Sequence, residues 1–483
     1  MSSNKKIEID YDPAFAVGEN EKVYPSYVKG KWRTLKWWLT AVLLSIYYFG
    51  PFLRFDRGGG RPDQAFLVDL DAPRIFFLWI EIYPQEIYIL TAFLLLCATI
   101  MFITANVFGR IWCGFLCVQT VWTDVFWAIE RMVEGDRSAR IRMDISQKNF
   151  KQLWLRSLKY FLWALVSFAT SAAWVMYFND APTFMANLFT LSLSVKQWSM
   201  LFLFSTTTFM FAGFAQGRIC KYMCPWGRFQ ASMFSPDTIQ VYYRGYRGEP
   251  RQKGVQNLDT DTRGDCIDCD ACVRVCPMGI DIRNGMQIDC IGCALCIDAC
   301  DDIMDKVDLK KGLIAFDTEA NMMNKRRGDP VGKISVVHKR SIFFAVLLTI
   351  LTTILITSTL NRATLSLTAS INRSPVYVLL KDGSIRNRYT FKVENRINIP
   401  RPVSISIIGL KHYTLKYNGK ISQNGVLYID LLGDDMVNLD VFLTIPKSAI
   451  NIDDMRFKIQ VKDEDNTEYS ETTTKNAQFY APK

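Results

Sequence analysis

The feature that most constrains this chain is a duplicated run of four cysteines between residues 266 and 300. Both runs have the spacing C-x2-C-x2-C-x3-C, and they comprise Cys266, Cys269, Cys272 and Cys276, then Cys290, Cys293, Cys296 and Cys300. Three thiolates at this spacing can converge on three irons of one 4Fe-4S cube, and the fourth ligand usually comes from the other run. The sequence therefore predicts two 4Fe-4S clusters, one bound by Cys266, Cys269, Cys272 and Cys300 and the other by Cys290, Cys293, Cys296 and Cys276.

Zinc and a disulfide framework are the alternatives for the same cysteines. Zinc sites typically combine paired C-x2-C elements across longer spacers and often include histidine. Here two complete four-cysteine runs follow each other, and Pro277 comes directly after the first, which fits clusters better. We therefore interpret residues 262–305, within a region spanning 216–340, as a ferredoxin-like electron-transfer module.

Five apolar blocks interrupt the chain, at about residues 37–53, 87–107, 157–178, 197–215 and 341–360. Each approaches the roughly 20 residues that cross the hydrocarbon layer of a membrane as a helix. The sequence therefore predicts an α-helical membrane bundle of about five spans. Four of them lie within residues 37–215, and the fifth follows the inserted module at 341–360.

The charges of the loops predict the orientation of this bundle. Residues 1–36 and 108–156 are rich in Lys and Arg, whereas the stretch between the third and fourth blocks has only Lys196. Because basic loops stay on the cytoplasmic side, we expect residues 1–36, 108–156 and 216–340 in the cytoplasm of a bacterium. The protein would then be a multi-pass inner-membrane protein with its C-terminus in the periplasm.

The net charge of +10 fits contact with membrane lipid, because the basic residues flank apolar blocks and no nucleic-acid-binding motif accompanies them. Residues 121–133 carry apolar side chains at helical spacing. This pattern predicts an amphipathic helix on the inner membrane surface.

The C-terminal region, residues 365–483, has a different period. Tyr389, Phe391 and Val393 alternate with polar residues, and the same alternation recurs at 403–407, 439–443 and 457–461, with Asn-Gly turn signals at 418–419 and 424–425. Several short strands at this spacing predict an immunoglobulin-like β-sandwich. Nothing in the region indicates catalysis, so we interpret it as a docking module.

Four further cysteines form two C-x3-C pairs, each after an apolar block. The phrase GRIWCGFLC at 109–117 is similar to GRICKYMC at 217–224, which indicates a parallel repeat. We expect the two pairs to meet at the cytoplasmic edge of the bundle, with copper handling or a thiol relay as the preferred interpretation and zinc or a third cluster as alternatives. The residues are Cys113, Cys117, Cys220 and Cys224.

Two absences limit the classes of electron donor. The two histidines, His338 and His412, are predicted on opposite sides of the membrane, which excludes a bis-histidine haem inside the bundle. The sequence has no C-x-x-C-H haem attachment site, and no G-x-G-x-x-G follows a predicted strand. We therefore expect electrons to arrive from a quinol or from another protein.

With these features assembled, the sequence resembles the FixG/CcoG (RdxA) family of cytochrome oxidase accessory proteins over nearly the whole chain. The resemblance is carried by WCG at 112–114, VQTVWTD at 118–124, CKYMCPW at 220–226, PMGID at 277–281 and the eight module cysteines. One departure concerns the residue after the first C-x3-C pair. The family often has proline there, as Pro225 follows Cys224, but this chain has Val118, which puts the local turn in question.

The resemblance implies a cupric reductase that serves the maturation of a cbb-type haem-copper oxidase. The clusters would deliver single electrons, the four membrane-edge thiols would bind or relay copper, and oxidase subunits or copper chaperones would dock on the sandwich. Two other functions remain open. One is a quinol-linked ferredoxin-type subunit for another reductase, and the other is a copper-binding assembly scaffold without turnover.

Overall fold

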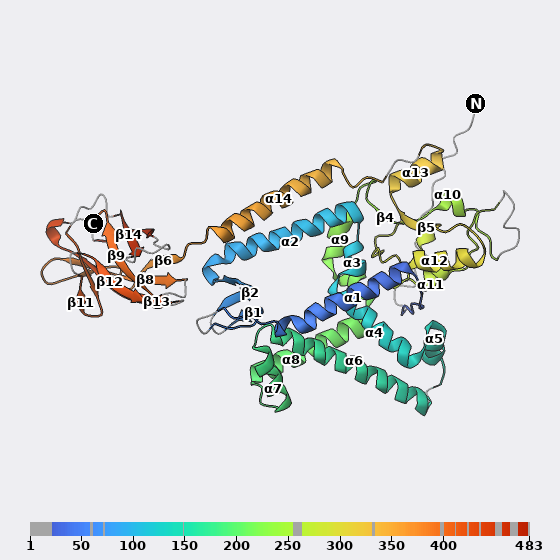
Figure 1. Ribbon diagram of the computed structural model, residues 1–483, viewed down its shortest axis with the longest axis horizontal. Coiled ribbons are helices and arrows are strands. Elements are labelled where there is room, and N and C mark those ends of the chain that lie inside the picture. The colour runs from blue at the N-terminus through green and yellow to red at the C-terminus, as the bar shows by residue number, and fades with distance from the viewer. Residues whose placement is uncertain are drawn as a thin grey trace. The chain divides into compact units, whose positions relative to one another are not determined.

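The computed structural model describes residues 22–481 except for 58–60, 71–72, 148, 255–262, 331–333, 397–399, 411, 423–424, 434–435, 450–455 and 464–471. The predicted basic segment up to residue 21, the first residue of the predicted module and Asn424 of the second turn signal lie outside the described residues. The chain divides into two compact units, one covering most residues up to Ile356 and the other containing Thr357–Lys483 (Figure 1). Each unit is described by itself.

Five helices in the described residues are long and apolar enough to cross a membrane: Ile87–Phe108, Ile111–Glu134, Phe150–Met176, Val195–Ala215 and Lys339–Leu360. The second combines α3 (Ile111–Phe115) with α4 (Val118–Glu134), and the fourth combines α8 (Val195–Thr208) with a π-helical segment at Phe209–Ala215. The others are α2, α6 and α14. This is a membrane protein, and the number of apolar helices agrees with the predicted bundle.

One of the five differs from the predicted set. The block at 37–53 folds largely as helix α1 (Lys31–Phe49), but the chain segment Ile111–Glu134 takes its place among the five. The physical reason lies in the first turns of α1, where Arg33 and Lys36 lower its mean hydropathy. Both side chains are buried within the protein and contact other helices there.

Helix α4 also differs from the predicted surface helix at 121–133. Its buried residues lie on several sides of the helix and include charged groups. Glu130 forms ion pairs with Arg140 at 2.9 Å and Lys159 at 3.5 Å, and Lys159 also pairs with Glu134 at 2.7 Å. These contacts join α4 to α5 (Arg137–Ile145) and α6, so α4 belongs to the interior of the bundle.

The remaining elements of the first unit are short. A three-stranded sheet consists of β1 (Phe66–Asp69), β2 (Arg74–Phe77) and β3 (Ile80–Ile82). Ser194 caps α8, since its Oγ accepts a hydrogen bond from the Gln197 backbone N–H at 3.3 Å. Other helices include α7 (Ala181–Phe189), α9 (Pro225–Ser232), α10 (Gly245–Gly248) and α13 (Glu319–Arg327).

The ferredoxin-like module contains helices α11 (Ala271–Arg274) and α12 (Leu295–Lys306) beside an antiparallel pair, β4 (Gln240–Tyr243) and β5 (Ile314–Asp317). Its core continues into the membrane bundle. The Trp32 ring of α1 lies 4.9 Å from the Phe316 ring of β5 and 6.3 Å from the Phe115 ring of α3. The module is therefore packed on the bundle within one unit.

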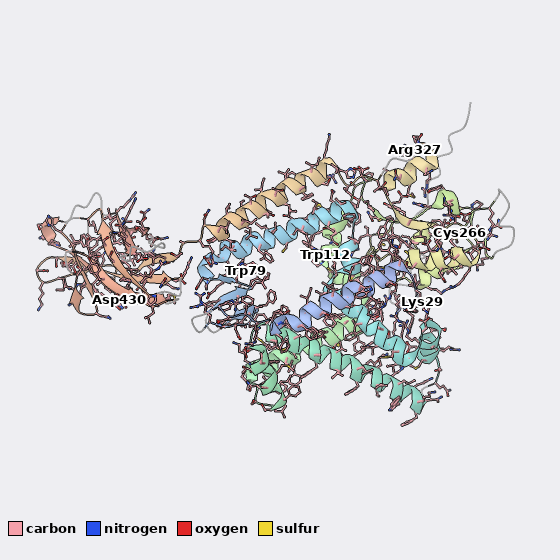
Figure 2. The ribbon with its side chains drawn as sticks, viewed as in Figure 1. Lys29, Trp79, Trp112, Cys266, Arg327 and Asp430 are labelled. Atoms are coloured by element: carbon pink, nitrogen blue, oxygen red, sulfur yellow. The ribbon has the colours of Figure 1, made fainter. Side chains whose placement is uncertain are left out.

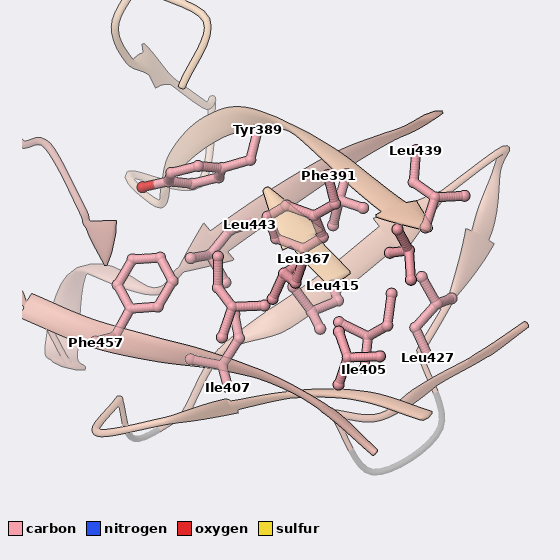
Figure 3. Close-up of a cluster of buried hydrophobic side chains, with 14 of the residues drawn as sticks. Leu367, Tyr389, Phe391, Ile405, Ile407, Leu415, Leu427, Leu439, Leu443 and Phe457 are labelled. Atoms are coloured by element: carbon pink, nitrogen blue, oxygen red, sulfur yellow. The ribbon is translucent and has the colours of Figure 1, made fainter. Parts of the chain in front are cut away.

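The second unit contains an immunoglobulin-like sandwich of two antiparallel sheets, as the alternation predicts. One sheet has the order β11-β10-β13-β8-β6, with β7 on β8, and the other has the order β12-β9-β14-β15. Figure 3 shows Phe391, Ile405 and Leu443 in the buried cluster. The strands are β6 (Leu365–Ile371), β7 (Val378–Leu379), β8 (Ile385–Asn395), β9 (Arg401–Ile408), β10 (Thr414–Tyr417), β11 (Lys420–Ile421), β12 (Leu427–Leu431), β13 (Met436–Ile445), β14 (Arg456–Asp463) and β15 (Thr472–Gln478).

Candidate iron-sulfur and thiol site

The two cysteine runs of the module have the same backbone path. In each run the residue before the second cysteine and the residue after it have positive φ: Asp268 and Asp270 at 51° and 57°, Gly292 and Ala294 at 67° and 60°. Left-handed residues at these two places turn the chain sharply around each run. The two runs therefore share a local backbone conformation as well as a spacing. In each run the first three cysteines line one cavity.

Each run meets the last cysteine of the other run. Helix α12 carries Cys300 to the first run, so that one small cavity is lined by Cys266, Cys269, Cys272 and Cys300. A second cavity is lined by Cys276, Cys290, Cys293 and Cys296, and Cys272 lines it as well. These are the two predicted ligand sets. We call them the first and second cysteine site, and their assignment as cluster ligands remains a prediction.

The residues at both sites fit 4Fe-4S clusters. Every sulfur donor is a free thiol, and most of the other lining residues are apolar. In the described residues no three Cys, His, Asp or Glu side chains are close enough to share one metal ion. In a 4Fe-4S cube each of the four thiolates binds a different iron, so a site with four thiols supplies the full ligand set.

Burial dominates the electrostatics of these thiols. It raises the pKa of Cys272, Cys276 and Cys300 to about 12 and that of Cys290 to about 11. Backbone N–H groups of Ile280 and Gly292 oppose the rise at Cys276 and Cys290. The free thiols are therefore neutral at pH 7, and they release protons when a metal binds.

The four membrane-edge cysteines come together beside the module. Cys220 interacts electrostatically with Cys117, Cys113 and Cys224. Burial and then these three thiols raise its pKa to about 11. The structure thus brings the two C-x3-C pairs close together, as the repeat predicts.

Each pair ends at the start of a helix. Cys117 precedes α4 with φ −65° and ψ 130°, and Cys224 precedes α9 with φ −79° and ψ 110°. The two backbones are therefore similar, even though Val118 follows one cysteine and Pro225 the other. The departure from the family pattern at Val118 leaves the turn unchanged.

The first pair touches the second cysteine site directly. A Cβ on Gly114 would lie 2.8 Å from the Cys293 Cα and 2.8 Å from the Ile291 carbonyl oxygen. Cys113 and Cys293 belong to the same buried cluster, and Cys296 is packed against this cluster. Figure 2 labels Trp112, the residue before Cys113, and Cys266 in the module. Only glycine permits this approach of the two backbones.

One cysteine of the second pair, Cys220, lies at a cavity of about 1760 Å³ between the membrane helices and the module. Cys220 lines it, together with Phe214 of the π-helical segment and Met278 and Gly279 of the module. A small solute can therefore approach Cys220 from this cavity.

Several residues near the sites carry no sequence signal. Gln230 of α9 accepts a hydrogen bond from the Cys113 thiol, with 2.9 Å between Sγ and Oε1. Asp298 of α12 accepts hydrogen bonds from the backbone N–H groups of Trp32 and Arg33, at 3.2 and 2.7 Å. Asp298 occupies one of the unspecified positions between Cys296 and Cys300. Its contact with α1 is therefore visible only in the tertiary structure.

Two family models match the chain. Residues 215–319 match a 4Fe-4S dicluster domain, and residues 355–482 match the IG-like fold at the C-terminal of FixG. Together they cover the module and the sandwich. The match to a dicluster domain agrees with two cysteine sites in the module.

Curated relatives extend the similarity to most of the chain. The proteins RdxA and RdxB of Cereibacter sphaeroides are each 43% identical, over 80% and 83% of this chain and 82% and 85% of their own length. The nitrogen fixation protein FixG of Rhizobium meliloti is 36% identical over 89% of this chain and 87% of its own. The chain therefore belongs to the FixG/RdxA family of membrane-bound iron-sulfur electron-transfer proteins.

Proposed function

We propose that this protein reduces Cu(II) to Cu(I) at Cys113, Cys117, Cys220 and Cys224, and that the Cu(I) serves the assembly of a cbb-type haem-copper oxidase. The observation that carries the proposal is that Cys113 and Cys293 belong to one buried cluster, and that the neighbouring Gly114 lies against the Cys293 backbone. A metal ion held by the membrane-edge thiols would lie next to the second cysteine site.

Different residues of the chain would bind the clusters, admit the copper ion and bind it. The module cysteines would hold two 4Fe-4S clusters, which supply single electrons when bound. The cavity beside Cys220 admits the copper ion, and the four thiols bind it as they lose their protons. Thiolates favour Cu(I) over Cu(II), so that binding and one-electron reduction of the ion reinforce each other.

The partners follow from the same proposal. Copper ion is the substrate, and a quinol or a redox protein donates the electrons. The described strands of the sandwich share one core, and we propose a docking role for it toward oxidase subunits or a copper chaperone. We also propose the inner membrane of a bacterium as the location, with the sandwich in the periplasm.

The test uses the full-length protein, purified anaerobically with its clusters reduced and the reductant removed. Cu(II) is added with a Cu(I)-specific chromophoric chelator, and cluster absorbance is followed. We expect reoxidation in step with the appearance of Cu(I). The double variant Cys220→Ser, Cys224→Ser should lose this reaction while it keeps its iron and sulfide.

Cys97→Ser is the matched control, because Cys97 lies in α2 and belongs to neither pair. Unchanged copper-driven reoxidation in the double variant would contradict the thiol assignment. If the clusters of the unaltered protein stay reduced with Cu(II) but reoxidise with a quinone, a quinol-linked subunit is the better description. Stoichiometric copper binding without any reoxidation would instead support an assembly scaffold.

A further inference from the structure

The cavity beside Cys220 is larger than a metal ion requires. Its volume of about 1760 Å³ exceeds the roughly 300–1,000 Å³ of most small-molecule sites, so an organic molecule fits in it as well. The membrane bundle contributes four aromatic rings to its lining: Trp127 of α4, Tyr160 and Trp163 of α6, and Phe214 of the π-helical segment. Such rings favour a ligand with a flat apolar body.

Two buried polar atoms of α4 lie at this cavity, three residues apart and so on one face of the helix. Trp127 is 4% exposed, and its Nε1 finds no acceptor among the described residues, whereas Trp163 donates its N–H to the Phe126 carbonyl at 3.2 Å. Buried indole N–H groups usually have an acceptor. The cavity therefore presents a hydrogen-bond donor to a ligand.

Glu130 supplies an acceptor beside that donor. It is 1% exposed, and its Oε2 accepts a hydrogen bond from Arg140 at 2.9 Å. In the described part of the chain its Oε1 accepts none, although Lys159 Nζ lies 3.5 Å away and Lys22 Nζ 3.9 Å away. The ligand that suits this face of α4 both accepts and donates hydrogen bonds.

The aromatic wall of the cavity adjoins the outer surface of the bundle. Tyr160 and Phe214 line the cavity and stack with 5.8 Å between their ring centroids. Phe161 and Phe211, on the same two segments, are 64% and 43% exposed. Both segments belong to helices that are apolar enough to cross a membrane, so their exposed faces meet lipid. A molecule dissolved in the membrane can therefore reach the cavity past these rings.

The opposite wall separates the cavity from both cysteine sites by single residues. Pro277, Met278 and Ile280 line the cavity and also the second cysteine site. Asp270 and Arg283 line the cavity and also the first. A donor in the cavity would thus lie one residue away from each site. Two sites that each take one electron match a donor of two electrons.

We propose that this cavity binds a membrane quinol, with its head group between Trp127 and Glu130, and that this quinol is the electron donor of the protein. The Trp127 N–H donates a hydrogen bond to one quinol oxygen, and Glu130 Oε1 accepts one from a quinol hydroxyl. Oxidation of one quinol to the quinone releases two electrons and two protons. One electron passes to each cysteine site when its cluster is bound, and the protons pass to Glu130 and to water.

Other ligand classes match these atoms less completely. An anionic lipid head group would accept from Trp127 but offers no hydrogen to Glu130 Oε1. A metal cation would contact Glu130 but offers no acceptor to Trp127. A quinol has both kinds of group on a flat ring, and its apolar tail suits the lipid-facing side of the cavity. The inference names the donor for the proposed function and rests on that function for the later transfer of the electrons to copper.

The test uses the full-length, cluster-loaded protein in detergent, without copper. Decylubiquinone and a short-chain menaquinone are titrated separately by isothermal titration calorimetry. The corresponding quinols are added anaerobically to the oxidised protein while cluster absorbance is followed. We expect one of these quinones to bind once per chain, and its quinol to deliver two electrons. Trp127→Phe keeps an aromatic ring but loses the N–H, so it should weaken quinone binding about three- to tenfold and slow reduction by the quinol.

Trp122→Phe is the matched control. Trp122 lies on the same helix, but it packs against Tyr47 and Tyr48 and is not one of the described residues that line the cavity. Its variant should bind quinone as the unaltered protein does. A photoreactive azidoquinone should label α4, α6 or the π-helical segment of the unaltered protein, mapped by mass spectrometry of its peptides.

Three results would overturn the proposal: binding of neither quinone, equal affinities of Trp127→Phe and Trp122→Phe, or a label confined to other elements. If Trp127→Phe loses its clusters, the position of the label on the unaltered protein decides. Because copper is absent throughout, failure of copper reduction leaves these results unaffected. Failure of quinone binding likewise leaves the copper experiment intact, since its clusters are reduced beforehand by another reductant.

Discussion

At the scale of the residue, Gly114 is the point where the membrane-edge pair meets the second cysteine site. A Cβ there would lie 2.8 Å from two atoms of the 291–293 backbone and 2.9 Å from the Cys293 N. Backbone atoms cannot move aside as the end of a flexible side chain can. The contact therefore depends on a residue that no cluster motif identifies.

Gly114→Ala should separate the two segments and destabilise the protein by about 1–3 kcal/mol, the usual cost of overpacking. We expect slower copper-driven reoxidation of the clusters with full iron content, measured by stopped-flow absorbance. Gly245→Ala is the control, because the nearest atom to its Cβ would be 3.8 Å away. Equal rates in the two variants would show that the contact at Gly114 does not control the electron path.

The residues of the candidate site were predictable to different degrees. The eight module cysteines lie within 35 positions of one another, and their spacing reflects a local backbone path that recurs in both runs. Cys113 and Cys220 were found through the repeated phrase around them. Trp127 and Glu130 could not be found, because their positions at the cavity depend on the fold.

At the scale of the element, α4 shows why the helical spacing of apolar residues predicted the wrong environment for this helix. Its apolar stripe predicts contact with one surface, but its polar positions are buried as well and are neutralised by α1, α5 and α6. The sandwich strands were predictable because a strand with one buried face alternates at every second residue. A helix whose charged residues form ion pairs inside the bundle has no comparable pattern in its sequence.

Glu130→Gln tests the importance of this ion-pair network. The variant leaves Arg140 and Lys159 buried with less negative charge nearby, and breaking a buried pair typically costs about 3–5 kcal/mol. We expect a lower midpoint of thermal unfolding in detergent, followed by circular dichroism of the helices. Asp302→Asn is the control, since its pair with Lys306 is exposed and such pairs contribute about 0–1 kcal/mol. Similar midpoints for the two variants would contradict an interior role for α4.

At the scale of the whole molecule, the two units have separate cores. The buried cluster of the sandwich consists entirely of residues from Leu365 onward, and the cysteine sites are lined by residues up to Ile314. The sandwich also contains no cysteine. Cluster binding and stability of the sandwich should therefore respond independently to mutation.

Phe391→Ala provides the test of that independence. Phe391 is fully buried, and its β8 strand pairs with β13 on one side and β6 on the other, so its loss should reduce the free energy of unfolding of the sandwich by about 3–5 kcal/mol. Iron content and the reduced-cluster spectrum should stay as in the unaltered protein. Limited proteolysis measures the first effect and metal analysis the second. Loss of iron together with the sandwich would mean that the units are coupled, and the docking role would then need an account of how a partner on the sandwich affects the clusters.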